Sequence, residues 1–556
     1  MSDERKKVLE MLAEGKINVD EAERLLKALG ENTPPPGNEP DREEPSSKTG
    51  RQFDDLENQI RSSVDDVRRT VQASMPRLRT VIRDAAPDVE RIVEEATSSI
   101  PGMVDEVSRA IRDALGSVRN AGDDEFPVKV ERQFSEEAPI QPESELELRN
   151  PRGHIEVVTW DEERFQADVH LTVKSRDEET AQSCADAVQL LQEPGDGRLT
   201  LRPVFPKGKE DASYRLDILL HVPRRLRLNL HTSHGDLVVP EMENDVVLSG
   251  HHGKLHLEGT SGDAGIDHHH GGVVLGRIGG KLALNAHHAG VTMDEVVEEA
   301  NVNAHHGGIT LRRIGGNLSL NSHHAPLEAQ EVHGTAVINS HHGPVNLRQV
   351  LGDVTVNSHH GAVEIDDIGG SLRLASNHGG VNIRQVSGDL SARNSHAGLC
   401  IESVGRSAVV HHTHCALDLG EVNGEVTVEC ERGAMHLGRA GGRVTVRANR
   451  GEVVIENPAG EVMVENNRAA ITVTSNEPVH SAYTLSNNRG DVTVVLPEGS
   501  DLDVQGFVRK GNIETDLPLD VAANGQQGQS VNGTLGKGGA KLQAEVDAGR
   551  LCLRAG

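Results

Sequence analysis

The segment "HHGGVVLGRIGGKLALNA" (residues 269–286) contains the pattern that decides the fold. It divides into two similar halves of nine residues, and each half has glycine followed by an apolar, any, apolar triplet. Alternation of this kind is typical of a β-strand with one buried face, and glycine is typical of a tight corner. Each half therefore predicts one short strand and one corner.

The same pattern recurs every 18 residues. Equivalents of His270 form a column of eleven histidines from His234 to His414, and the column then continues with Arg432, Arg450 and Arg468. A period of this length leaves no room for a crossover helix and indicates a solenoid. The sequence therefore predicts a mainly β fold, a single long β-solenoid with 18-residue rungs and about 14 rungs.

Composition agrees with a thin, extended body. The 556 residues include 58 glycines and only nine aromatic residues, too few large side chains for a thick globular core. We expect Val273, Leu275, Leu282 and Leu284 to point inward, so that equivalent residues of successive rungs stack as apolar columns. The net charge of −29 argues against nucleic acid as a partner, because binding to phosphates needs a basic surface.

Other segments flank the repeat. Residues 1–30 predict a helical hairpin, 31–51 a Pro-rich disordered linker, and 52–121 an amphipathic helical segment interrupted by prolines. Residues 122–232 predict a mixed α/β sheet that caps the N-terminal end, with "DEETAQSCADAVQLLQ" (177–192) as one helix. The solenoid with its histidine columns is expected over 233–492, and C-terminal strands and a β cap over 493–556.

The amphipathic segment 52–121 has two interpretations. Its polar face is nearly neutral and it has a single aromatic residue, Phe53, which gives little attraction to anionic lipid. Packing of these helices, including self-association into a homo-oligomer, is therefore favoured over docking on a membrane surface. Both alternatives stay open.

Parts of the chain resemble two known families. "LEMLAEGKINVDEAERLLKALGE" (9–31) resembles the SHOCT-like helical hairpin found at the start of some bacterial envelope-stress proteins. The strands "LDILLHVPRRLRLNLHTSHGDLVV" (216–239), the repeated Gly-x-Val-x-Leu units and "VTVVLPEGSDLDVQGFVRKGNIETDLP" (492–518) resemble the DUF4097 family of bacterial adhesin-like β-solenoids. The resemblance implies a non-enzymatic scaffold whose partner is a protein or an envelope component, and it implies no catalytic residues.

The family's corner is usually Ser-Gly-Asp-like, so the histidine pair is a departure, and three interpretations compete. Stacked imidazoles could serve structure alone; neutral imidazoles of adjacent rungs could bind Zn, Ni or Cu; or the stacked rings could make the edge respond to pH. The metal hypothesis rests on seven complete pairs: His251, His252, His269, His270, His287, His288, His305, His306, His323, His324, His341, His342, His359 and His360.

Several functional classes are disfavoured. The chain has no phosphate-binding Gly-rich loop, nucleophile elbow or zinc-protease motif, so neither a catalytic nor a cofactor site is predicted. Five sparse cysteines do not indicate a disulfide framework, and Cys400, Cys415 and Cys430, spaced by 15, should lie in different columns of an 18-residue repeat. Without a signal peptide or a long apolar run, the default location is the cytoplasm, with envelope association as the alternative.

Overall fold

The computed structural model describes residues 126–206, 212–523 and 528–556. They lie within one structural unit, Asn120–Gly556. The hairpin, linker and amphipathic helices expected over residues 1–121 lie outside the described residues.

A single rung shows how the sequence pattern becomes structure. In β18 (Ala336–Ser340) the side chains of Ala336, Ile338 and Ser340 are buried, while Val337 and Asn339 point outward. A corner leads to β19 (Val345–Val350), in which Val345, Leu347 and Val350 are buried and the two residues before Val350 both point outward. Each strand pairs in parallel with its equivalents in the rungs before and after, so the first and second strands of successive rungs build two sheets.

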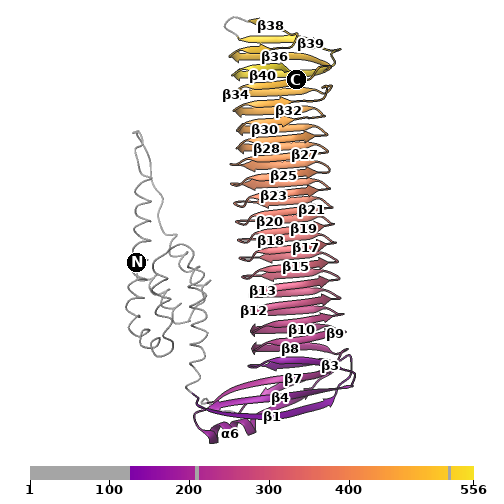
Figure 1. The fold of residues 1–556 in the computed structure, drawn as a ribbon, viewed down its shortest axis with the longest axis vertical. Helices are drawn as coiled ribbons and strands as arrows, with labels where there is room; N and C mark the ends of the chain where they lie inside the picture. The colour runs from indigo at the N-terminus through magenta and orange to yellow at the C-terminus, as the bar shows by residue number, and fades with distance from the viewer. Residues whose placement is uncertain (1–125, 207–211, 524–527) are drawn as a thin grey trace, which may run out of the picture. The chain divides into compact units, whose positions relative to one another are not determined.

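The rungs stack in one column, coloured from purple to yellow in Figure 1. The first sheet contains β2 (Glu145–Asn150), β8 (Arg227–His234), β10 (Val246–His252), β14 (Ala300–Ala304), β16 (Leu318–Ser322), β18, β20 (Val354–Ser358), β22 (Leu372–Ser376), β24 (Leu390–Ser395), β26 (Ala408–Thr413), β28 (Val426–Arg432), β30 (Val444–Arg450), β32 (Val462–Arg468), β34 (Tyr483–Arg489), β40 (Ala540–Ala548) and β36 (Leu502–Lys510).

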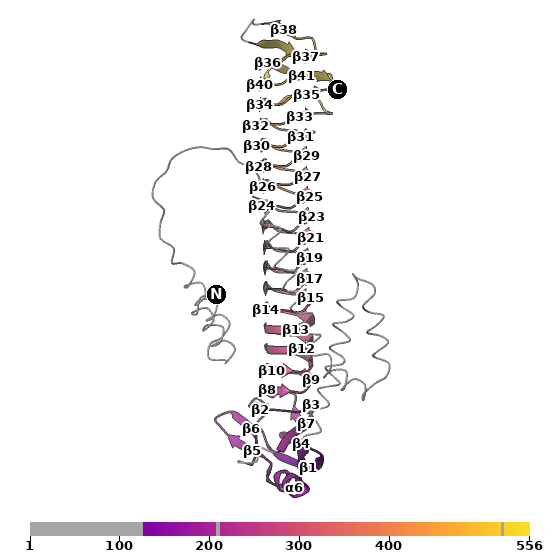
Figure 2. The same cartoon turned by 90° about the vertical axis from the view of Figure 1, so that its left-hand side faces the viewer.

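The second sheet lies opposite (Figure 2). It contains β3 (Ile155–Trp160), β9 (Leu237–Met242), β11 (Leu255–Thr260), β15 (Ile309–Ile314), β17 (Leu327–Val332), β19, β21 (Val363–Ile368), β23 (Val381–Val386), β25 (Leu399–Val404), β27 (Leu417–Val422), β29 (Met435–Ala440), β31 (Val453–Glu456), β33 (Ile471–Thr474), β35 (Val492–Leu496), β41 (Leu551–Ala555) and β37 (Ile513–Thr515). The strands β12 (Ala264–Ile278) and β13 (Leu282–Val296) run through the corner and belong to both sheets.

The predicted solenoid is confirmed. From β8 to β32 every rung pairs with the next at a step of 18 residues, and one longer step then joins Val462 to Tyr483, for about 15 turns in all. Val273, Leu275, Leu282 and Leu284 are all buried, as expected. Columns of Val, Ile and Leu between the two sheets form the core.

At the N-terminal end, one rung lies between the rest of the solenoid and a cap. The rung formed by β2 and β3 lies against β8 and β9, within the stretch expected as a mixed cap. Beyond it, β7 (Ala212–Pro223) pairs with β3, followed by β4 (Arg164–Ser175) and β1 (Val128–Pro139) in antiparallel order. On the other sheet, β6 (Arg198–Val204) pairs with β2 and with β5 (Gln189–Pro194). Antiparallel edge strands thus end both sheets.

The helix of this cap is shorter than expected. It is α6 (Glu178–Ala187), with Asp177 as N-cap accepting a 2.7 Å hydrogen bond from the backbone N–H of Thr180. The prediction of helix over 188–192 was wrong, because Val188 is extended and the following residues pair as β5 with β6. No helix within the described ranges is long and apolar enough to cross a membrane.

The C-terminal end uses the same arrangement. After β35 the chain passes to β36, makes the antiparallel strands β38 (Asp520–Ala523) and β39 (Gln529–Leu535), and returns as β40 and β41. The returning pair inserts between β34 and β36 in one sheet and between β35 and β37 in the other. A segment late in the sequence therefore forms an inner rung.

Candidate functional site

The predicted histidines lie at one corner of the solenoid, between the first strand and the second strand of each rung. The first members of the pairs form the first histidine column: His251, His269, His287, His305, His323, His341 and His359. The second members belong to the second histidine column: His234, His252, His270, His288, His306, His324, His342, His360, His378, His396 and His414. All fourteen candidate ligands are therefore on one edge, opposite the Ile-Gly-Gly corner such as residues 314–316.

The imidazoles of each column stack on one another. Neighbouring ring centroids are 4.8 to 5.4 Å apart in the first column and 4.6 to 5.0 Å apart in the second. In the middle of the edge the rings are nearly parallel, at 1° for His323 and His341 and 2° for His324 and His342. The spacing follows that of the strands, because each ring is attached to the rung beneath it.

Backbone and serine hydrogen bonds fix these corners. The N–H groups of His341 and His342 donate to the carbonyls of Ser322 and His323 in the preceding rung, both at 3.0 Å. Ser340 is buried, and its hydroxyl donates across the corner to the carbonyl of Gly343 at 2.9 Å. Ser322 and Ser358 form the same bond in their own rungs, so the serines beside the histidines bridge the corners.

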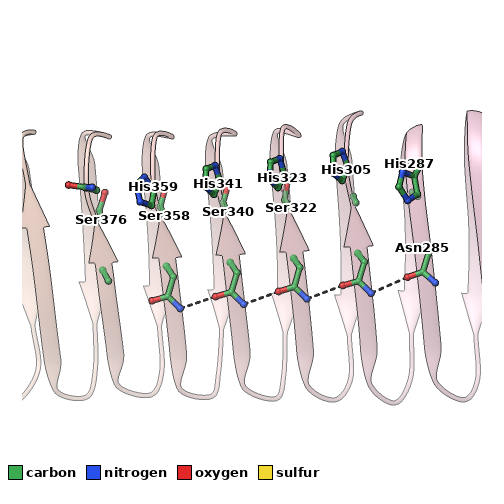
Figure 3. Close-up of a pocket in the computed structure, with 18 of the residues that line it drawn as sticks. Asn285, His287, His305, Ser322, His323, Ser340, His341, Ser358, His359 and Ser376 are labelled. Carbon is green, nitrogen blue, oxygen red and sulfur yellow. Dashed lines mark hydrogen bonds between the residues drawn. The ribbon is translucent and has the colours of Figure 1, made fainter. Parts of the chain in front are cut away.

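An asparagine ladder runs beside the first histidine column, and sequence reasoning missed it. It consists of Asn285, Asn303, Asn321, Asn339 and Asn357, whose side-chain amides donate from one rung to the carboxamide oxygen of the preceding rung at 2.8 to 3.0 Å. Figure 3 shows this chain of bonds below the histidine rings. Its signal was present in the sequence, since asparagine recurs at the same 18-residue period.

A groove runs between these two rows of side chains. Asparagines form one wall, first-column histidines form the other, and Ala286, Ala304, Ser322, Ser340, Ser358 and Ser376 lie along its floor. Its volume is about 860 Å³. Asp267 lies at one end and Arg393 at the other, and no carboxylate lines the groove between them. The part of the groove between Asp267 and Arg393 therefore has no negatively charged lining residue, although the chain has a net charge of −29.

Five histidines of the edge favour the neutral form. Desolvation by the surrounding protein, and then repulsion from neighbouring imidazoles, lowers the pKa of His305, His306, His341, His342 and His378 below the ordinary value of 6.5. Neutral imidazole offers one donor and one acceptor per ring. His305 and His341, which line the groove, can therefore form hydrogen bonds with hydroxyl and amide groups in their neutral form.

Three imidazoles converge where the first histidine column ends. The ring nitrogens of His359, His360 and His378, all exposed, lie within 4.8 Å of one another, the one such group of metal-ligating side chains in the described parts of the chain. Asn377 replaces the next first-column histidine, and the rings of His360 and His378 are tilted by 28°. Two ligands from one rung and one from the next form a triangle, which suits one face of a tetrahedral metal site.

A second hollow lies in the N-terminal cap. It has a volume of about 810 Å³, and His154, Asp217 and Asp236 are among its lining residues. The N–H of His154 donates to Asp217 at 2.9 Å, and His154 Nδ1 accepts from the N–H of Asp236 at 2.8 Å. His154 is thus engaged in joining strands of the cap.

Comparisons with known proteins give two family matches. A model of the Toastrack DUF4097 family matches residues 226–553, and a model of a SHOCT-like domain matches residues 3–33, so both resemblances seen in the sequence are confirmed. A solved structure from Clostridium sporogenes, provisionally described as a cell adhesion protein, is similar at 9% sequence identity with a TM-score of 0.13. That match covers 76% of this chain and 100% of the other. No curated protein matches the chain.

Proposed function

Because the chain belongs to the Toastrack DUF4097 family, we propose that it is a non-enzymatic, adhesin-like scaffold that binds a protein or another component of the bacterial envelope. The groove between the asparagine ladder and the first histidine column is the proposed binding surface. One observation carries this proposal: the same polar side chains repeat at the groove from rung to rung, over residues 285–359. A partner with regularly repeated polar groups would meet an equivalent set of side chains at each rung.

The chemistry of the groove supports a polar partner. Within the ladder an asparagine uses one amide hydrogen and one lone pair of its oxygen, and retains one of each for a ligand. Imidazole nitrogens on the other wall add further donors and acceptors. Repeated identical sites suit multivalent binding, in which many weak contacts add, and do not suit a single pre-organised catalytic centre.

Co-sedimentation with insoluble bacterial envelope fractions tests this function. We expect the full chain to sediment with an envelope fraction, and the triple variant Asn321→Ala, Asn339→Ala, Asn357→Ala to stay largely in the supernatant. The matched control is Asn346→Ala with Asn382→Ala, two asparagines of the second sheet, which should sediment like the wild type. Equal sedimentation of the groove variant and the wild type would contradict the proposed site.

A role in the response to envelope stress is the finer part of the proposal. It is supported by the SHOCT-like domain over residues 3–33, since the resemblance links such hairpins to envelope-stress proteins. Residues 31–51 would then act as a linker, and 52–121 as a segment for self-association or for docking on a membrane surface. Liposome co-sedimentation of the full chain and of a chain lacking residues 52–121 distinguishes these uses. Only membrane docking predicts binding that the deletion removes.

Metal binding is a second candidate function, favoured by the convergence of His359, His360 and His378. Borderline divalent ions such as Zn, Ni and Cu prefer neutral imidazole, and the exposed rings can rotate to shorten the distances between their nitrogens. In a calorimetric titration with Zn²⁺ alone, we expect His378→Asn to weaken the tightest site by roughly tenfold or more. His414→Asn removes a histidine of the same column that has no first-column partner, and it should leave that site unchanged. Equal titrations of the two variants would rule out the site.

A further inference from the structure

The second histidine column does not end at His414 but changes into arginine. Arg432, Arg450 and Arg468 follow at the 18-residue step, and Arg489 follows after the longer step of the last rung. These four residues, the arginine column, are aligned in register on adjacent parallel strands, and all four are exposed. The sequence pattern suggested the first three members, and the strand pairing adds Arg489.

Four like charges in register should repel one another, and the described residues provide no partner that relieves this repulsion. None of the four guanidinium groups forms a hydrogen bond or ion pair within the described part of the chain. The neighbouring column contains Glu431, which makes no ion pair with Arg432, and then Asn449, Asn467 and Asn488.

Other arginines of the same rungs differ in this respect. Arg439 pairs with Glu421 of the preceding rung at 3.3 Å, and Arg443 pairs with Glu461 of the next rung at 2.5 Å. Arg447 lies 3.5 Å from Glu465, also one rung away. The fold thus neutralises cations from rung to rung where a carboxylate occupies the adjacent position, and the arginine column lacks that carboxylate. The chain has 86 acidic residues and 57 basic ones, so a shortage of carboxylates does not explain why the arginine column is unpaired.

A second asparagine ladder accompanies the arginines. The amide of Asn467 donates to Asn449 and that of Asn488 donates to Asn467, both at 3.0 Å. These amides retain N–H groups that point to no partner within the ladder, and they lie beside the guanidinium groups in sequence. Guanidinium forks and amide donors together are the groups that bind phosphate and carboxylate oxygens.

We propose that the arginine column binds a linear polyanion, a flexible polymer whose phosphate or carboxylate groups repeat along its length. The polymer lies along the edge from Arg432 to Arg489, with oxyanions on the guanidinium groups and on the adjacent asparagine amides. The negative charges of such a ligand would offset the repulsion between the aligned guanidinium groups. This site is separate from the groove, so its failure would leave the proposed groove function standing.

Titrations of the full chain with two probes test the proposal: long-chain inorganic polyphosphate and a polymer of uronic acid. We expect one of them to bind with an affinity that falls as salt rises, because binding displaces counterions. The variant Arg450→Gln with Arg468→Gln should lose roughly tenfold in affinity per arginine, the usual size of a charge-assisted hydrogen bond. The polymer that binds more tightly identifies phosphate or carboxylate as the recognised group.

The matched control is Arg439→Gln with Arg443→Gln, which removes the same charge from two paired arginines nearby. It should bind the polymer as the wild type does. Equal weakening of both variants would mean that net charge alone determines binding, and this would overturn the proposal. The proposal would also be overturned if neither polymer bound. Tighter binding to single-stranded DNA than to both probes would overturn the choice of polymer.

Discussion

At the scale of single residues, several polar side chains at the inward position just before the histidine corner share one task. Ser340, Asn394 and His412 occupy the same inward position, and each forms a hydrogen bond to a carbonyl three residues further on, at 2.9, 2.7 and 2.8 Å. A buried carbonyl without such a partner would lose its solvation. The position therefore accepts several polar residues that reach across the corner, and it also accepts alanine, as at Ala286 and Ala304.

The histidine columns predict a fall in stability below neutral pH. Partial desolvation by the surrounding protein and repulsion from neighbouring imidazoles hold the pKa of His341 and His342 below 6.5 in the folded protein, whereas the unfolded chain restores the ordinary value. Their contribution to stability is then fully present above pH 6.5 and is lost as the pH falls through the folded pKa, because the unfolded chain binds protons first.

Thermal unfolding at pH 7.5 and pH 5.5 measures this effect. The unfolding temperature of the wild type should be lower at pH 5.5 than at pH 7.5. The difference should be smaller for the double variant His341→Asn with His342→Asn. The ladder asparagines suggest that asparagine fits such a stack. An identical fall in both proteins would show that these two histidines do not contribute.

At the scale of the rung, glycine sets how closely successive corners can approach. Gly271 has a φ of +132°, and a Cβ at this position would lie 1.7 Å from the carbonyl oxygen of Gly253 in the preceding rung. At Gly272, the adjacent residue, a Cβ would meet no atom within 4 Å. The two glycines of one corner therefore have different roles, which the sequence alone does not distinguish.

This difference gives a matched pair of variants. Gly271→Ala should reduce the free energy of unfolding by about 1–3 kcal/mol, because the methyl group forces a shift of backbone atoms. Gly272→Ala should change it by less than about 0.5 kcal/mol, as is usual for an open surface position. Denaturant unfolding of both variants checks the difference. A Gly272→Ala variant as unstable as Gly271→Ala would contradict the assignment of the close contact.

Much of the rung could be predicted from sequence because its period is strict. Alternation placed Leu282 and Leu284 in the core, and the 18-residue step placed the histidines on one edge. Cys400, Cys415 and Cys430 lie in different columns, as their spacing of 15 indicated. The groove could not be predicted in the same way, since it depends on the height of the asparagine wall above the serine and alanine floor.

At the scale of the whole solenoid, pairing between distant segments closes both ends. Near the N-terminal end, the inner rung of β2 and β3 lies in the sequence between the cap strands β1 and β4, and the inner rung near the C-terminal end comes after its cap. No local pattern predicts this order, because the deciding contacts join segments such as β34 and β40, which are 59 residues apart in register. Sequence reasoning predicted caps and missed the interleaving.

Because β40 and β41 lie between the solenoid and its C-terminal cap, a short truncation that removes them should strongly destabilise that cap. A chain that ends at Gly539 lacks β40 and β41, and it thereby loses the partner strands of both β34 and β36. We expect residues 502–535 to lose protection in hydrogen exchange, because their cap would no longer be joined to the stack. The N-terminal cap is the internal control and should stay protected. Unchanged protection of 502–535 would contradict the observed strand order.

The central claim is that identical side chains are presented in register, one per rung, along one straight column. The most direct test is the distance between spin labels at Asn285 and Arg393, in a variant whose Cys400 and Cys415 are serine. These positions are six rungs apart in register, so the backbone separation should be about 29 Å. Moving the first label to Asn303 should shorten it by about 5 Å. A distance that does not change by one strand spacing per rung would contradict the account.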